Sequence, residues 1–211
     1  MDSSIFSTIA ALFTISDEQA MWRVQMQDDA EAFAELMRRW ERPIQNLCTR
    51  MTGDAHRGED LAQETFLRIY ARRKDYQSSS KFSTYLWRVA LNLCHDELRK
   101  LKRRRESSLD NMESLEALEQ LQDTAPASPT LMEAQERAAE VRDALQQLAG
   151  PYRAVVVLRH YEDLKFREIA DVLGIPEGTV KSRMAEAMSQ LGKILQTAAS
   201  AEQTANERML L

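Results

Sequence analysis

Residues 58–76, GEDLAQETFLRIYARRKDY, restrict the fold more than any other stretch, because their apolar residues recur at helical spacing. At about 100° per residue, one side of a helix here carries Leu61, Ala62, Thr65, Phe66 and Ile69. This stripe predicts a helix packed on a domain core. The opposite side carries Asp60, Gln63, Glu64 and Leu67. A leucine among polar residues fits an apolar anchor for another protein, and it equally fits a tolerated surface leucine.

Composition extends the helical prediction to the whole chain. Glycine and proline are scarce, six and five in 211 residues, and β-branched runs are few, which predicts an all-α protein. The net charge of −5 means that DNA binding needs local basic patches or a partner. The two cysteines, Cys48 and Cys94, lie in no CxxC or Cys/His cluster, so we expect no metal site, no disulfide framework and a reducing cytoplasm. The apolar run 5–15 is too short to span a bilayer and lacks a basic flank, so we expect neither membrane insertion nor a signal peptide.

The order of helix signals predicts a first domain over residues 17–105, after an N-terminal extension of residues 1–16. Helices are expected to begin near Asp17 and near Asp29, and Pro43 suits the first turn of a third. The second of these places Phe33, Leu36, Met37 and Trp40 on one face. Gly53 marks the end of the third helix, and residues 58–74 form the next.

A polar loop at residues 75–80 leads into a long helix with a hydrogen-bonding stripe. Its members are spaced by four, three and four residues: Arg88, Asn92, His95 and Arg99. Six cations follow within residues 99–105, and aromatic residues lie at the helix start, at positions 76, 82, 85 and 87. Cations attract phosphates, Asn and Arg read base edges, and aromatic rings stack on unpaired bases, so the pattern favours nucleic-acid contact. The alternative is a solvated helix face beside core aromatics.

Charge changes sign after residue 105. Residues 106–136 hold eight carboxylates and no lysine or arginine, which predicts a linker over 106–130. A second domain is expected over 131–197, with a tail at 198–211. Its first helix carries Ala134, Ala138, Val141, Leu145 and Leu148 at helical spacing.

The second domain also carries the signature of a helix-turn-helix. A short helix over 166–173 is followed by the tight turn Gly174-Ile175-Pro176 and a second helix from about Glu177. The outward residues near the start of that helix would enter the major groove: Thr179, Lys181, Ser182 and Arg183. An ordinary helical hairpin is the alternative.

Two separate segments resemble parts of bacterial sigma factors. EDLAQETFLRIY followed by KFSTYLWRVALNLCHDELRK resembles sigma region 2, and LAGPYRAVVVLRHYEDLKFREIADVLGIPEGTVKSR resembles sigma region 4. With the helices before them they cover about residues 20–195, in the family's order and separation. The chain thus resembles an extracytoplasmic-function (group IV) sigma factor of RNA polymerase, with two small helical domains joined by an acidic linker.

The resemblance implies partners and sites. Asp60, Gln63, Glu64 and Leu67 would bind core RNA polymerase, on the clamp coiled coil of the largest subunit. The separated −10 strand would contact Tyr76, Gln77, Ser78, Ser79, Lys81, Arg88, Asn92, His95, Arg99 and Arg103. The −35 duplex would contact Thr179, Lys181, Ser182, Arg183 and Glu186. An anti-sigma factor is a further expected partner, the protein works in the cytoplasm, and neither a cofactor nor enzymatic activity is implied.

The sequence departs from the family pattern at one place, and two other functions are possible alternatives. Ala185 and Glu186 stand where the family commonly has a large residue and an arginine, so a typical −35 preference is not expected. An autonomous helix-turn-helix regulator is the alternative function, but it leaves the Leu67 face and the 88–99 stripe without a role. A metal nuclease built on His56, Glu59, Asp60 and Glu64 fails because these residues do not share one helix face. The acidic linker and net charge predict that the free protein covers its DNA-binding faces.

Overall fold

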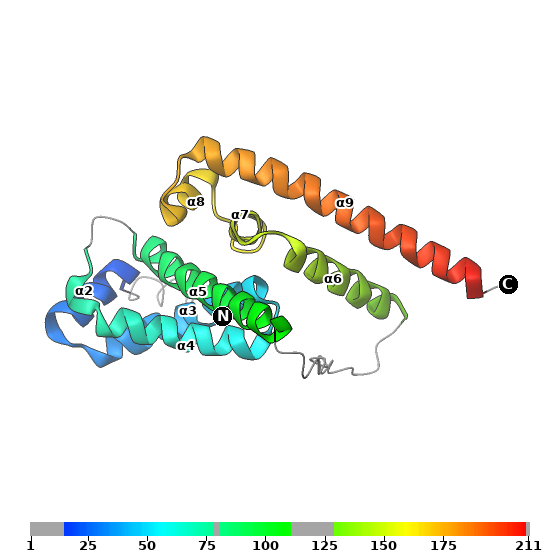
Figure 1. Cartoon of the computed structure of the whole chain (residues 1–211). Helices are drawn as coiled ribbons and strands as arrows, with labels where there is room; N and C mark the ends of the chain where they lie inside the picture. Colours follow the sequence, from blue (N-terminus) through cyan, green and yellow to red (C-terminus); the bar gives the residue numbers. More distant parts are fainter. Residues whose placement is uncertain (1–14, 78–80, 111–128, 210–211) are drawn as a thin grey trace, which may run out of the picture.

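The computed structural model describes residues 15–77, 81–110 and 129–209, and all regular secondary structure in these ranges is helical (Figure 1). The predicted all-α class with two helical domains is confirmed. The first domain holds α2 (Asp17–Gln27), α3 (Ala30–Thr52), α4 (Ala55–Ala71), the 3-10 turn η1 (Arg73–Asp75) and α5 (Phe82–Asp110). The second holds α6 (Pro129–Gln147), α7 (Gly150–His160), α8 (Phe166–Leu173) and α9 (Glu177–Met209).

The core of the first domain forms where α3, α4 and α5 pack together with α2. All five members of the predicted α4 stripe are buried: Leu61, Ala62, Thr65, Phe66 and Ile69. Larger side chains from the other helices complete this core, among them Met21, Leu36, Ile44, Leu47, Met51, Phe82 and Leu86. The helical period therefore located the inner face of α4 correctly, and its outer face follows from that.

The predicted break at Pro43 is wrong, because α3 is one helix of 23 residues with Pro43 inside it. A proline within a helix costs about 3 kcal/mol through a lost hydrogen bond and a steric clash. Leu36 on one side of it and Ile44 and Leu47 on the other are fully buried, and continuing the helix keeps them on one face. The predicted ends hold, since the Asp29 side chain caps the first turn and Gly53 ends the helix with a φ of 78°.

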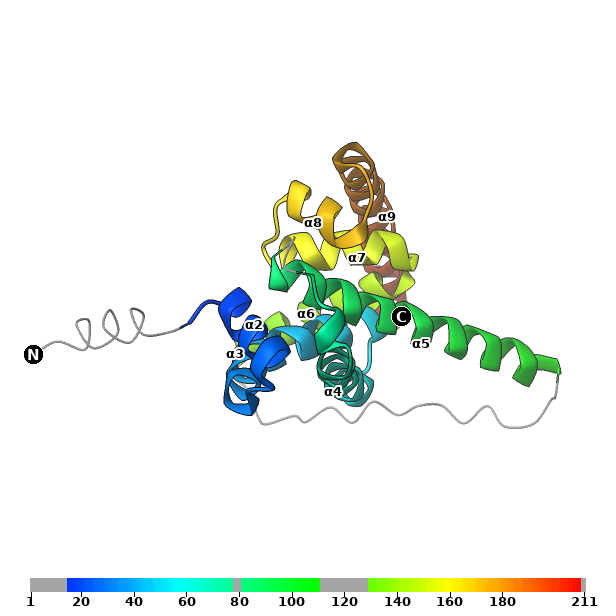
Figure 2. The ribbon, with the colours of Figure 1, turned by 90° about the vertical axis from the view of Figure 1, so that its left-hand side faces the viewer.

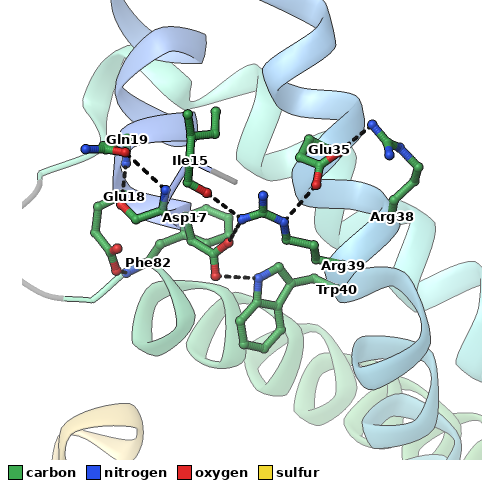
Figure 3. A network of polar contacts seen from close by, with 10 residues as sticks. Ile15, Asp17, Glu18, Gln19, Glu35, Arg38, Arg39, Trp40 and Phe82 are labelled. Atoms are coloured by element: carbon green, nitrogen blue, oxygen red, sulfur yellow. Dashed lines mark hydrogen bonds and ion pairs between the residues drawn. The ribbon is translucent and has the colours of Figure 1, made fainter. Parts of the chain in front are cut away.

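A polar network fixes the start of α2 against α3 and α5 (Figure 3). The Asp17 carboxylate accepts hydrogen bonds from Arg39 at 2.8 Å and from the Trp40 indole at 2.9 Å. The Glu18 carboxylate accepts from the backbone N–H of Phe82 at 3.2 Å. A carboxylate near the N-terminus of a helix satisfies a free N–H and complements the helix dipole. The first turn of α2 thus joins three helices of the first domain.

Two helices extend beyond the residues at which they were expected to end. α5 continues to Asp110 instead of ending near residue 105, and its last turns extend away from both domains (Figure 2). Most of the linker predicted over 106–130 lies outside the described residues. α9 runs without a break to Met209, so residues 198–209 continue the helix where a separate tail was expected. No helix in the described ranges is long and apolar enough to cross a membrane.

The apolar stripe predicted for α6 is only partly correct. Leu145 and Leu148 are buried, but Ala138 and Val141 are exposed. The C-terminal end of α6 is the part that reaches the first domain, where the Gln146 amide donates to the carbonyl of Arg50 in α3 at 2.8 Å. Burial on α6 is therefore concentrated near that contact.

The two domains pack on each other along two lines. The C-terminal end of α3 meets α6 and α7, and the first half of α5 meets α8 (Figures 1 and 2). The first domain thus supports the second through the helix that carries the predicted hydrogen-bonding stripe.

Candidate partner-binding and nucleic-acid interfaces

The outer face of α4 presents an exposed leucine with a polar rim. Leu67 is 65% exposed, and Asp60 and Gln63 are exposed beside it on the side opposite the core. Glu64 is partly exposed and accepts a hydrogen bond from Arg68, one turn on, at 2.8 Å. The structure brings all four predicted residues to one surface. An apolar side chain inside a polar rim suits a contact that buries the leucine and keeps the rim hydrated.

The predicted stripe on α5 also forms one helix face. Arg88, Asn92, Arg99 and Arg103 are exposed, and His95 is half-buried between them. Arg99 pairs with Asp96 at 3.1 Å, an exposed contact within the same helix. Such pairs contribute little, about 0–1 kcal/mol, so the guanidinium can exchange this partner for a phosphate at little cost. The face combines cations with one amide, which suits a nucleic-acid strand.

The loop before α5 departs from the prediction at Tyr76. This side chain is 6% exposed, with its ring 6.2 Å from that of Phe82 and 5.4 Å from that of Tyr85 between centroids. Burial is the main cause that raises the pKa of Tyr76. The Tyr76 ring is thus packed in the core in this conformation. Gln77 and Lys81 are exposed as expected, while Ser78 and Ser79 lie outside the described residues.

His95 faces the second domain. Its Nε2 is buried and has no hydrogen-bond partner among the described residues, and a Cβ on Gly150 would lie 3.8 Å from it. Burial lowers the pKa of His95, and the nearby Arg99 lowers it further. Both effects disfavour the protonated imidazole where the two domains meet.

The recognition helix α9 presents a mixed outer face. Lys181, Ser182 and Glu186 are exposed, whereas Thr179 and Arg183 are partly buried. Lys181 pairs with Glu177 at 2.7 Å, and Glu186 accepts a hydrogen bond from the amide of Gln190 at 2.7 Å. The amide of Gln190 therefore holds the carboxylate of Glu186 in place on this face. Glu186 was predicted as a contact residue, but its hydrogen bond with Gln190 was not predicted.

One residue that joins the two domains was not predicted from the sequence. Arg153 in α7 is 6% exposed and donates to the carbonyl of Met51, at the C-terminal end of α3. It also donates to the side-chain oxygen of Gln146 at 2.6 Å and to the carbonyl of Leu148 at 3.0 Å. The available signal was an arginine directly before the apolar run 154–158, because a charge in a buried helix needs partners.

The described residues form three candidate binding surfaces. In the described ranges, no group of three or more His, Cys, Asp or Glu side chains is placed to hold a metal ion. The surfaces that do form are an apolar anchor on α4, a cationic stripe on α5 and a helix-turn-helix made by α8 and α9.

Comparisons with known proteins agree with this division. Residues 36–104 match the family model of sigma-70 region 2, and residues 138–191 match that of sigma-70 region 4. The ECF RNA polymerase sigma factor SigW of Bacillus subtilis is 35% identical over 171 residues, which cover 79% of this chain and 90% of SigW. The RNA polymerase sigma-H factor of Pseudomonas aeruginosa is 32% identical over 187 residues, 85% of this chain and 94% of that protein.

A solved structure shares the fold. CnrH, in complex with the cytosolic domain of CnrY, aligns with a TM-score of 0.63 and 20% identity, over 87% of this chain and 99% of CnrH. Two matched regions in the same order, and relatives matched over nearly their whole length, leave one assignment. The chain belongs to the extracytoplasmic-function sigma factors, the subunits that give RNA polymerase its promoter specificity.

Proposed function

We propose that this sigma factor binds core RNA polymerase through Asp60, Gln63, Glu64 and Leu67, on the clamp coiled coil of the largest subunit. The observation that carries the proposal is the 65% exposure of Leu67 on the face of α4 opposite the core. A leucine of that exposure gains free energy when a partner covers it, at about 25 cal/mol per Å² of apolar surface. The polar residues around it would set orientation and exclude other partners.

The α5 stripe would hold the opened −10 strand. Arg88, Asn92, His95, Arg99 and Arg103 share one face, and Gln77 and Lys81 lie at its N-terminal end. Unstacking a base costs a few kcal/mol, which contacts in the loop and phosphate neutralisation along α5 would offset. Tyr76 has no part in this site as long as it stays in the core, and Ser78 and Ser79 remain sequence-based candidates.

The α8–α9 helix-turn-helix would hold the −35 element as duplex. Ser182 and Glu186 lie on the outward side of α9, with Lys181 to one side and Arg183 and Thr179 to the other. A carboxylate in the major groove accepts from the amino group of cytosine and repels phosphates. We therefore expect weak −35 affinity and a preference for cytosine opposite Glu186.

Regulation and location belong to the same proposal. Among solved structures that share the fold, one holds CnrH with the cytosolic domain of CnrY, and another holds the sigma factor RpoE with the anti-sigma factor NepR from Bartonella quintana. An anti-sigma factor for this chain, group IV membership, a cytoplasmic location beside RNA polymerase and the absence of enzymatic activity are all part of the proposal. The autonomous-regulator alternative is not favoured, because it gives the α4 face no role.

Run-off transcription tests the function. Purified core polymerase is assayed with and without this chain, on promoter fragments selected by the reconstituted holoenzyme. Defined transcripts are expected only when the chain is present. Specific binding of the chain alone to the same fragments, without any effect on transcription by core polymerase, would favour the autonomous regulator instead.

A further inference from the structure

The cationic stripe of the first domain is already in contact with the second domain. The Arg88 guanidinium in α5 donates to the carbonyl of Val172 at 3.1 Å and to that of Asp171 at 2.5 Å. Both carbonyls belong to the last turn of α8. Seven residues before Arg88, the Lys81 ammonium pairs with Glu168 of α8 at 3.1 Å. The first helix of the helix-turn-helix thus lies along the N-terminal half of the stripe.

The groups that α8 presents are similar in charge to a nucleic-acid backbone. The C-terminal end of a helix carries a partial negative charge on carbonyls that lack an intrahelical donor. Glu168 adds a full negative charge one turn earlier. The Arg88 guanidinium uses Nε and Nη2 for these two carbonyls, and the same pair of donors can bind two phosphate oxygens. Arg88 therefore cannot bind α8 and a DNA strand at the same time.

A second set of contacts holds the domains in this position. Arg50 in α3 pairs with Glu162, after α7, at 3.5 Å, and its guanidinium lies 4.3 Å from the ring centre of Tyr161. The buried Arg153 adds its bonds to the end of α3. Separation of the domains would break these contacts together. The domain contact thus rests on two independent groups of residues, one at α5–α8 and one at α3–α7.

The same arrangement leaves two other surfaces uncovered. Leu67 on α4 is exposed, and so are Lys181 and Glu186 on the recognition helix. By contrast, Arg88, Asn92 and His95 share the lining of a cavity of about 390 Å³ with Gly174 and Arg183 of the second domain. Arg88, at the N-terminal end of the stripe, is thus engaged by α8, while Leu67 and the outward residues Lys181 and Glu186 of α9 remain uncovered.

We propose that α8 acts as an intramolecular competitor of the −10 strand in the free protein. This inference rests on the proposed function of the stripe. In the closed state the chain can dock on polymerase and on a −35 duplex, but it cannot take the −10 strand until α8 leaves α5. Opening of the two domains and capture of the −10 strand are then one coupled event.

Binding of two DNA probes to the full-length free chain tests this inference. One probe is a fluorescent single strand with the −10 sequence, and the other is a −35 duplex, both taken from a promoter selected by the holoenzyme. The opening variant is Glu168→Gln, which removes the charge facing Lys81 and keeps an oxygen for the Lys165 N–H that Glu168 now accepts from at 3.0 Å. Asp163→Asn is the matched control, because it removes one exposed carboxylate of the same domain that does not touch α5.

The two probes are expected to respond differently to the opening variant. Glu168→Gln should tighten binding of the single strand several-fold and leave the duplex affinity unchanged, and Asp163→Asn should change neither. If only a tenth of the free chain is open, the apparent affinity for the strand is reduced about tenfold and full release regains that factor. The double variant Glu168→Gln/Arg50→Ala removes one ion pair from each group of contacts and should move strand binding further toward this limit, with circular dichroism confirming that it remains folded.

The outcomes separate the inference from the function beneath it. Equal single-strand affinity for the wild type and the double variant, when both bind the strand in the presence of core polymerase, would overturn the competitor role of α8 and leave the proposed function intact. The competitor role is likewise overturned if neither free chain binds the strand while both holoenzymes do. Failure of both chains to bind the strand even with core polymerase would instead refute the −10 role of the stripe.

Discussion

The backbone of Gly58 in α4 approaches α3 so closely that a Cβ at position 58 would lie 2.8 Å from the backbone nitrogen of Thr49. Real Cβ atoms do not come so near to a backbone atom, so only glycine fits here. The close approach sets the distance between α3 and α4, and α4 is the helix that carries Leu67.

Replacement of Gly58 by alanine should therefore destabilise the first domain. We expect Gly58→Ala to lower the free energy of unfolding by about 2 kcal/mol or more, because a methyl group forces two packed helices apart. Gly192→Ala is the control, since nothing lies within 4 Å of a Cβ there and its φ is not positive. That change should stabilise α9 by ~0.5–1 kcal/mol. Urea unfolding measures both, and equal effects would contradict the packing argument.

The half-buried His95 should make stability depend on pH. Its pKa lies below the ordinary value of 6.5, chiefly through burial, with Arg99 and Arg153 opposing protonation and Asp96 favouring it. The unfolded chain then takes up the proton more readily, so this contribution is full above about pH 6.5 and is lost as the pH falls below it. Unfolding midpoints at pH 7.5 and 5.5 should differ less in His95→Gln than in the wild type. An identical difference in the two proteins would contradict this role.

The carboxylate of Glu186 should limit the affinity for the −35 duplex. Glu186→Arg should tighten duplex binding and steepen its salt dependence by about one unit in the slope of log K against log salt. Glu186→Gln should relax the preference for cytosine without the change in slope. Anisotropy titrations at several salt concentrations measure both effects. Tighter binding by Glu186→Arg with an unchanged slope would argue against a phosphate contact at this position.

Loss of the amide on the α5 stripe should affect only the opened strand. Asn92 is exposed and carries no charge, so Asn92→Ala leaves the counterion term unchanged. We expect the holoenzyme to bind the −10 strand several-fold more weakly, with the same salt slope and an unchanged −35 affinity. Equal weakening on both probes would mean that the change disturbs the fold and not a base contact.

Local patterns predicted much of this molecule because they report on one helix at a time. The α4 stripe, the helix-turn-helix and the caps at Asp29 and Gly53 each depend on neighbours in sequence. The break expected at Pro43 was wrong because a local penalty was outweighed by burial on both sides of it. Tyr76 was expected to face a base, but its side chain is buried. An aromatic residue near a basic stripe has the same sequence pattern in both cases.

The contacts between the domains could not be predicted from the sequence in this way. Lys81 and Glu168 are 87 residues apart, and Arg153 and Met51 are 102 apart. No periodicity relates such pairs. Occlusion of a DNA-binding face was expected from charge alone, but charge could not indicate which face is covered.

Binding of Leu67→Asp to core polymerase tests whether the exposed face of α4 is the polymerase-binding surface. The measurement is the dissociation constant of a fluorescent chain from purified core, with Val141→Asp as the control, since Val141 is an exposed apolar residue of α6 outside every proposed surface. We predict that Leu67→Asp weakens binding at least tenfold, about 1.4 kcal/mol, while Val141→Asp binds as the wild type does. Core binding by Leu67→Asp at wild-type affinity would contradict the role of Leu67 as the anchor for core polymerase.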